Sequence, residues 1–185
     1  MNEIRMGFIG CGGNARGHVG RVLEMRDCEI VSLCDSSNKS IDAVKNQYEV
    51  SNLPAFTDFE EMLKEVEMDA VQISTPHTLH FDQIMACLNK GLHVLCEKPM
   101  VCTVDHAHQV LEKHRGSEKI LMVSYQRHLE AQYRYVRNQI AAGELGDIQF
   151  VSALQDQAWY RGTMGLWRQQ LSLSGGGQLN DSGSH

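Results

Sequence analysis

The amino-acid sequence predicts an α/β fold built on a doubly wound parallel sheet. Short apolar segments alternate with amphipathic segments of helical length over residues 1–124, and this order is typical of parallel βαβ units. A glycine-rich turn follows the first apolar segment, and polar clusters follow three of the later ones. Because ligands bind such sheets where the strands end, these clusters are candidates for a binding site.

The glycine-rich turn lies between a predicted strand at residues 4–9 and a predicted helix. Its residues are Gly10-Cys11-Gly12-Gly13-Asn14-Ala15. In dinucleotide sites the first glycine allows a tight turn, the second lets the backbone approach a pyrophosphate, and a small third residue lets helix and strand pack closely. The free N–H groups of the helix N-terminus would face the phosphates. This context favours a Rossmann-type cofactor site over a solvated loop.

A second predicted strand, residues 29–34, ends at Asp35. This acid lies 20 residues beyond Ala15, where a carboxylate accepts the ribose hydroxyls of NAD. It would also repel the 2′-phosphate of NADP, so NAD is the expected cofactor. NADP remains the alternative, because Ser36, Ser37 and Lys39 could receive a phosphate if Asp35 turned aside.

The remaining elements of the sheet follow in order. Further strands are predicted at residues 54–57, 69–74, 93–97 and 120–124. Helices are predicted around Ile41, Val44 and Tyr48, and at residues 59–66, 81–90 and 103–114. Asp58 with Glu61 forms a capping box, Gly91 ends the third of these helices, and Thr103 caps the fourth.

The pattern changes after residue 124. We expect residues 1–124 to form the NAD(P)-binding domain and residues 125–185 to begin a second, incomplete domain. A helix is predicted to end at Gly143, and a long strand is predicted at residues 147–154. Since one strand cannot satisfy its own edges, we expect residues 145–160 to mediate self-association, and the protein to be a homo-oligomer.

The composition narrows the classes of partner. The net charge of −6 supplies no basic stripe for a nucleic-acid backbone, and no window approaches the roughly 18 apolar residues of a membrane span. Six cysteines without a C-x-x-C pair favour free thiols in a reducing cytoplasm. The histidine pairs at 77 and 80 and at 106 and 108 lack the further ligands of a zinc site, so no metal is expected.

Two further polar groups could carry chemistry. Glu97-Lys98-Pro99 follows a buried strand directly, where proline fixes the backbone and a cis Lys-Pro bond is one option; a surface turn is the alternative. Asp181 and His185 are four residues apart, a spacing that suits a general base oriented by a carboxylate, although a linker would read similarly. The aromatic residues are interpreted as core or interface rather than as a substrate platform: Tyr125, Tyr133, Tyr135, Trp159 and Trp167.

The sequence resembles the glucose-fructose oxidoreductase and inositol dehydrogenase family through four motifs in order. These are Gly10-Cys11-Gly12-Gly13-Asn14-Ala15, Ser74-Thr75-Pro76-His77 with His80, Glu97-Lys98-Pro99, and Gly175-Gly176-Gly177-x-Leu179-x-Asp181-x-Gly183-x-His185. The resemblance implies a Rossmann domain followed by an α+β substrate-binding domain with a mostly antiparallel sheet. Because that sheet extends well beyond the fourth motif in the family, we expect this chain to hold only the start of the second domain.

The resemblance also implies roles for individual residues. Lys98 would hydrogen-bond the reacting hydroxyl, His185 would act as acid and base, and Asp181 would support the imidazole or bind substrate. An ammonium group stabilises a forming alkoxide while a histidine takes the proton. Glu97 would contact the nicotinamide ribose. The other implied cofactor contacts are Ser74, Thr75, Pro76, His77 and His80.

The expected function is hydride transfer between a nicotinamide cofactor and a sugar, polyol or related hydroxy compound. Two alternatives stay open: a non-catalytic dinucleotide-sensing regulator on the same fold, and a glycoside hydrolase that uses NAD transiently. The joint presence of Lys98, Asp181 and His185 favours the enzyme, because a sensor needs none of them. Asp181 and His185 lie near a terminus that is expected to fray. We therefore expect the 185-residue chain to bind cofactor without turnover.

Overall fold

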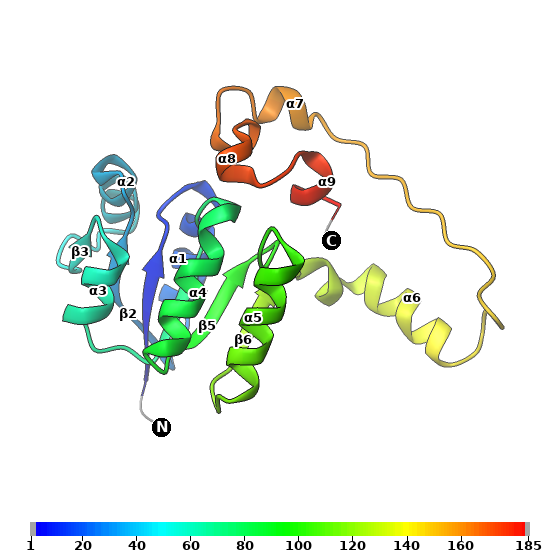
Figure 1. Ribbon diagram of the computed structural model, residues 1–185, viewed down its shortest axis with the longest axis horizontal. Coiled ribbons are helices and arrows are strands. Elements are labelled where there is room, and N and C mark those ends of the chain that lie inside the picture. The colour runs from blue at the N-terminus through cyan, green and yellow to red at the C-terminus, as the bar shows by residue number, and fades with distance from the viewer. Residues whose placement is uncertain (1–2, 184–185) are drawn as a thin grey trace.

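The computed structural model describes residues 3–183. Within them six strands form one parallel sheet in the order β3-β2-β1-β4-β5-β6 (Figure 1). The strands are β1 (Ile4–Ile9), β2 (Cys28–Cys34), β3 (Ala55–Phe56), β4 (Ala70–Ile73), β5 (His93–Glu97) and β6 (Leu121–Ser124). The strand order reverses between β1 and β4, which creates a crevice at the carboxyl ends of these strands. The predicted doubly wound sheet is confirmed as a Rossmann fold.

Helices cover both faces of the sheet. They are α1 (Gly13–Leu23), α2 (Asn38–Tyr48), α3 (Phe59–Glu65), α4 (His80–Asn89) and α5 (Val104–Arg115). Helices α1 and α2 pack on one face through a buried cluster that includes Phe8, Val19 and Ile41. Helices α3, α4 and α5 pack on the other face, and Figure 1 shows α4 and α5 in front of the strands. Both faces are therefore buried, as a parallel sheet requires.

The predicted caps are present. Asp58 Oδ1 accepts hydrogen bonds from the backbone N–H groups of Glu60 (2.8 Å) and Glu61 (3.4 Å) at the start of α3. Thr103 Oγ1 accepts one from His106 N (3.2 Å) at the start of α5. Each bond satisfies an N–H that has no partner inside its helix, so the helix starts predicted here are fixed by local chemistry.

Beyond β6 the chain forms short helices and a long extended segment. The elements are η2 (Gln126–Leu129), α6 (Ala131–Ala141), α7 (Trp159–Gly162), η3 (Trp167–Gln169), α8 (Leu171–Ser174) and α9 (Gln178–Asp181). Figure 1 shows the chain leaving the sheet after β6, running outward as α6, and returning as α7 to α9 above the ends of the strands. There Thr78 Oγ1 donates to Ser172 O at 2.9 Å, which ties α8 to the turn before α4.

The strand predicted at residues 147–154 is wrong. This segment lies extended but joins no strand ladder among residues 3–183, and its apolar side chains are open to solvent, with Phe150 at 83% and Leu154 at 95% exposure. An extended segment becomes a strand only when a neighbour receives its N–H and C=O groups. The prediction is therefore right about extended backbone and wrong about a strand.

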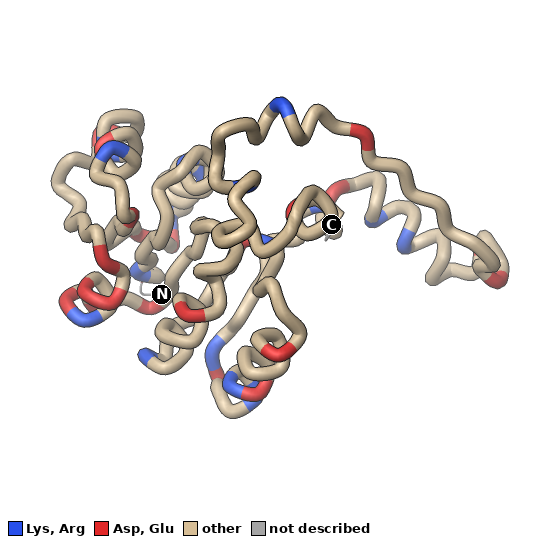
Figure 2. The backbone as a smooth tube through the Cα atoms, turned by 45° about the horizontal axis from the view of Figure 1, so that its top comes forward, with Lys and Arg blue, Asp and Glu red and all other residues tan. Residues whose placement is uncertain are grey.

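The described chain has free cysteines and charged side chains of both signs. All six cysteines are free, and burial raises the pKa of Cys11, Cys34 and Cys87 to about 12. Lys and Arg are interspersed with Asp and Glu along the backbone (Figure 2). Over residues 3–183 we find no helix with both the length and the apolar character needed to cross a membrane.

Candidate cofactor and catalytic site

The glycine-rich loop packs its first glycine directly against the end of β4. Gly10 has φ of +96°, and a Cβ there would lie 2.5 Å from the backbone oxygen of Ser74. A Cβ at Gly12 would meet nothing within 4 Å, so this position borders open space in front of the N-terminus of α1. Ala15 is fully buried between α1 and the sheet. The loop thus leaves its backbone open to an incoming group, as a dinucleotide cradle requires.

Gly10 and Gly12 offer a matched pair of substitutions. Gly10→Ala combines a left-handed φ with a backbone clash, and we expect it to lower the free energy of unfolding by about 3 kcal/mol or more. Gly12→Ala has φ of −69° and a free Cβ, so it should change stability by less than about 1 kcal/mol. Urea denaturation of both variants checks this, and equal midpoints would contradict the account of Gly10.

Two adjoining cavities form one cleft along the strand ends. The first, of about 730 Å³, borders β2 and β4, and the second, of about 530 Å³, borders β5. The two share Gly12, Ser74, Thr75 and Trp167. Asp35 and Pro76 line the first cavity, and the second is lined by Gly13, Asn14, His77, Glu97, Lys98 and Arg168. The cleft therefore brings most of the predicted site residues together, and its length suits a two-part ligand.

Asp35 is held rigidly at the end of β2. Its Oδ2 accepts a hydrogen bond from Cys11 N (2.8 Å) and its Oδ1 accepts one from Ser37 N (2.9 Å). Each carboxylate oxygen keeps a lone pair for a ligand hydroxyl. Asp58 and Glu60 lie on the same cavity, and none of the described residues lining it is a lysine or arginine. This half of the cleft is consequently suited to sugar hydroxyls.

Glu97 links the end of β5 to the first helix. His18 of α1 donates from Nε2 to Glu97 Oε1 at 2.9 Å, and both side chains are largely buried. Burial alone would raise the pKa of Glu97, but hydrogen bonds from His18 and Asn14 outweigh it and lower the pKa to about 2. Glu97 is thus ionised beside Lys98. His18 was not among the predicted site residues, because a lone histidine on an amphipathic helix carries no signal of its distant partner.

Lys98 meets the C-terminal segment at Asp181. The following Lys98–Pro99 bond is cis, which confirms that option of the sequence analysis. Lys98 Nζ donates to the backbone oxygen of Asp181 (2.6 Å) and to its Oδ1 (3.1 Å). Trp159 Nε1 and Arg168 Nε donate to Asp181 Oδ2 at 2.8 and 3.1 Å. These contacts bring two of the three predicted catalytic residues together.

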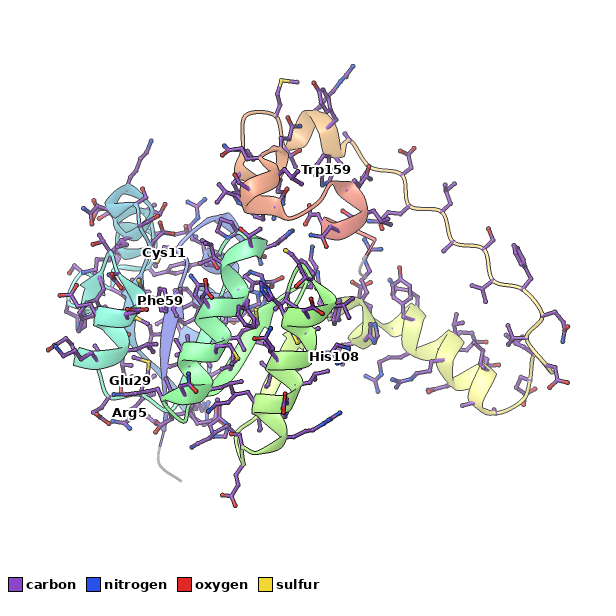
Figure 3. All side chains as sticks on the ribbon, viewed as in Figure 1. Arg5, Cys11, Glu29, Phe59, His108 and Trp159 are labelled. Carbon is purple, nitrogen blue, oxygen red and sulfur yellow. The ribbon has the colours of Figure 1, made fainter. Side chains whose placement is uncertain are left out.

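Asp181 does not lie at a frayed terminus, and that expectation is corrected. The residue is 6% exposed. Burial raises the pKa of its carboxyl, yet the hydrogen bond from Trp159 and the charge of Lys98 produce a net lowering. Figure 3 labels Trp159 in the segment above the strand ends, and its indole is one of the groups that fix α9 there. His185 lies outside the described residues.

His77 and His80 are both buried below the cleft. His77 Nδ1 donates to Ser174 O at 3.1 Å, and its Nε2 lies 3.6 Å from Asp181 Oδ1. Burial lowers the pKa of His77 to about 4, so at neutral pH this second contact joins a neutral ring to a carboxylate and is not a salt bridge. His80 Nδ1 and Nε2 lie 2.8 and 3.0 Å from the backbone oxygens of Pro99 and Thr75. His80 therefore positions two loops of the cleft from behind.

Trp167 and Arg168 are cleft residues that the sequence analysis missed. Trp167 lines both cavities, packs edge-on against the His77 ring with centroids 4.8 Å apart, and carries the Arg168 guanidinium 4.4 Å from its own centroid. Its interpretation as core or interface gave no hint of this placement. Among the described residues, no group of three or more His, Cys, Asp or Glu side chains is arranged to hold a metal ion.

Comparison with known proteins gives the same picture. Residues 4–125 match the GFO_IDH_MocA family, described as an oxidoreductase family with an NAD-binding Rossmann fold. The chain is 28% identical over 185 residues to D-glucoside 3-dehydrogenase of Escherichia coli, covering 100% of this chain and 52% of that protein. It is 29% identical over 182 residues to 1,5-anhydro-D-fructose reductase of Ensifer adhaerens, covering 98% and 54%. The chain thus spans about half the length of these relatives.

A solved structure extends the likeness beyond the sheet. The WlbA dehydrogenase of Bordetella pertussis, in complex with NADH and UDP-GlcNAcA, superposes with a TM-score of 0.82 at 25% identity, covering 98% of this chain and 55% of that one. The family match covers the glycine-rich loop and every strand of the sheet. On this match the chain belongs to the GFO_IDH_MocA family of oxidoreductases with an NAD-binding Rossmann fold.

Proposed function

We propose that the protein oxidises or reduces a hydroxyl-bearing carbon of a sugar, polyol or related compound, with NAD as cofactor. The observation that carries this is Lys98, which is bonded to Asp181 and lines the same cavity as the glycine-rich loop. A pure cofactor sensor has no use for an ammonium group at this place, whereas proton and hydride transfer need one. The division into domains at residue 124 and a homo-oligomeric state remain predictions.

The site residues fit a dinucleotide. Gly12 leaves open the space that a Cβ would fill, and the two cavities meet beside it at Ser74 and Thr75. The adenosine half would lie along Asp35, and the nicotinamide half along Asn14 and Glu97. When bound, NAD accepts or supplies the hydride. The protein's part is to bind and orient it and to manage the proton.

Lys98 would manage the charge on the reacting oxygen. Its ammonium group is fixed by two hydrogen bonds to Asp181, and it keeps a third N–H for the substrate hydroxyl. As the hydroxyl loses its proton, this cation stabilises the alkoxide more than it stabilises the neutral hydroxyl. His185 would take the proton, as the resemblance implies, and Asp181 would hold the Lys98 ammonium group in place.

Net NADH production by the intact protein across a panel of sugars and polyols tests this function. Turnover with at least one member is expected, with a burst-free linear rise in absorbance of NADH. Cofactor binding without turnover of any member would favour the sensing regulator, and glycoside cleavage without net NADH would favour the hydrolase. For the 185-residue chain, calorimetry with NAD and light scattering test cofactor binding and self-association separately.

Asp35 should make NAD the preferred cofactor. The carboxylate is fixed by two backbone N–H groups, and Asp58 and Glu60 add negative charge to the same cavity, so a 2′-phosphate would be repelled. Asp35→Ser is expected to weaken NAD binding about tenfold and to narrow or reverse the preference over NADP. Titration of both cofactors against both proteins measures this. Tighter binding of NADP by the wild type would refute the assignment.

A further inference from the structure

Two hydroxyls stand side by side where the halves of the cleft meet. Ser74 and Thr75 follow β4, and both residues line both cavities. Each hydroxyl is bonded from behind by a buried glutamine. Gln72 of β4 donates from Nε2 to Ser74 Oγ at 2.7 Å, and Thr75 Oγ1 donates to Gln83 Oε1 of α4 at 2.6 Å. The two glutamines are 1% and 5% exposed.

The two hydrogen bonds run in opposite directions. Ser74 Oγ accepts from an amide N–H, so the Ser74 proton is left for another acceptor, and the described residues supply none. Thr75 has given its proton to Gln83, so Thr75 Oγ1 has only lone pairs to offer. Hydroxyl protons rotate freely unless a neighbour fixes them. Gln83 fixes the Thr75 proton by accepting it, whereas Gln72 occupies a lone pair of Ser74 Oγ and so directs the Ser74 proton away from the amide.

Gln72 also has a buried polar atom that destabilises the fold and that packing does not explain. Its Oε1 is buried without a hydrogen-bond partner among the described atoms. Its neighbours along β4 are the fully buried Val71 and Ile73, and an apolar residue is the ordinary occupant of such a central parallel strand. Leaving a buried carbonyl unpaired destabilises a fold. A polar residue in place of the usual apolar one, bonded to a residue that lines a site, indicates a role in that site.

We propose that Gln72 and Gln83 are positioning residues that set the hydrogen-bond polarity of the cofactor cleft. Gln72 makes Ser74 a donor, which suits an acceptor-only group such as a pyrophosphate oxygen. Gln83 makes Thr75 an acceptor, which suits a ribose hydroxyl or an amide N–H. The pair would read the order of these groups along the ligand. This inference rests on the proposed dinucleotide function. It assigns part of the recognition to Gln72, which lines neither cavity, and to Gln83, which lines the first cavity beside Thr75.

The test is a double-mutant cycle with calorimetric NAD titration of the 185-residue chain. Gln72→Met keeps length and volume but removes the amide. It should weaken NAD binding about five- to tenfold and leave the urea midpoint unchanged or higher, because the unpaired carbonyl is gone. Ser74→Ala should weaken binding at least as much and lower the midpoint, because the Gln72 amide then loses its acceptor.

The double variant separates positioning from packing. If Gln72 acts through Ser74, then the double variant should bind NAD with the same affinity as the Ser74→Ala variant. Its urea midpoint should rise back towards that of the wild type. Gln83→Met with Thr75→Val should show the same non-additivity, and Gln72→Leu serves as a second apolar variant if the methionine variant folds poorly. Additive losses of affinity in the two cycles, or wild-type affinity in Gln72→Met, would overturn the inference. Failure of the wild type to bind NAD would instead overturn the proposed function.

Discussion

Lys98→Ala in the intact protein is expected to lower kcat by about 10²–10³-fold while NAD affinity changes by no more than a few-fold. The ammonium group faces the second cavity with two of its three N–H groups held by Asp181. It acts on charge that develops at the substrate oxygen, and that charge is absent from the bound cofactor. Loss of transition-state stabilisation therefore appears in kcat and kcat/KM together.

Lys64→Ala is the matched control for Lys98→Ala. Lys64 is also next to a carboxylate, Glu65, at 3.9 Å, but its side chain is 81% exposed and it lines neither cavity of the cleft. Steady-state rates and NAD titrations of both variants give the measurement. Near-wild-type turnover by Lys98→Ala on the best substrate would refute the assigned role. A stability check is needed for Lys98→Ala, since this change removes two of the hydrogen bonds that Asp181 accepts.

The sequence predicted those parts of the fold that short-range chemistry decides. Gly10 is required by the loop itself, Asp58 and Thr103 by the helix N-termini, and the strands by runs of apolar residues. These signals lie within a few residues of the structure that they specify. The cofactor half of the candidate site could be predicted from the sequence as well, because parallel strands bring their carboxyl ends to one edge of the sheet.

Contacts between segments that are distant in the sequence could not be predicted from local patterns. His18 and Glu97 are 79 residues apart, and nothing in the pattern around either residue names the other. Asp181 could be predicted as a candidate site residue but not as buried, since its burial depends on Trp159, Arg168 and Lys98 meeting over the cleft. The segment at residues 147–154 failed in the opposite sense. A strand was predicted there, but a strand also needs a neighbouring strand to pair with, and no local pattern supplies that neighbour.

Acid is expected to destabilise the fold between about pH 6.5 and pH 4, chiefly through His77. Burial lowers the pKa of His77 to about 4 in the folded chain, whereas an exposed histidine titrates near 6.5. Between these values the unfolded chain binds a proton that the folded chain does not. The free energy of unfolding therefore falls as the pH is lowered through this window and levels off below it. The difference corresponds to at most about 3 kcal/mol.

The groups around His77 act in separable ranges of pH. The Asp181 carboxylate lies 3.6 Å from the His77 ring, the His80 ring has its centroid 5.9 Å away, and the charges of Asp181 and Lys98 act on His77 in opposite senses. Burial lowers the pKa of His80 as well, so part of the slope between pH 6.5 and 4 belongs to that residue. The carboxyl groups act lower. The pKa of Glu97 is about 2 when folded, so its stabilising contribution is present above about pH 4.5 and is lost only as the pH falls towards 2.

His77→Gln isolates the contribution of His77. The amide of glutamine can still donate to Ser174 O, as the ring does at 3.1 Å, but it does not titrate. Urea midpoints measured from pH 7 to pH 4 should therefore fall less in the variant than in the wild type, with the remaining slope left to His80. His108→Gln, an exposed position on α5, should keep the wild-type slope. Identical slopes in wild type and His77→Gln would show that folding does not lower the pKa of His77, and would contradict this account.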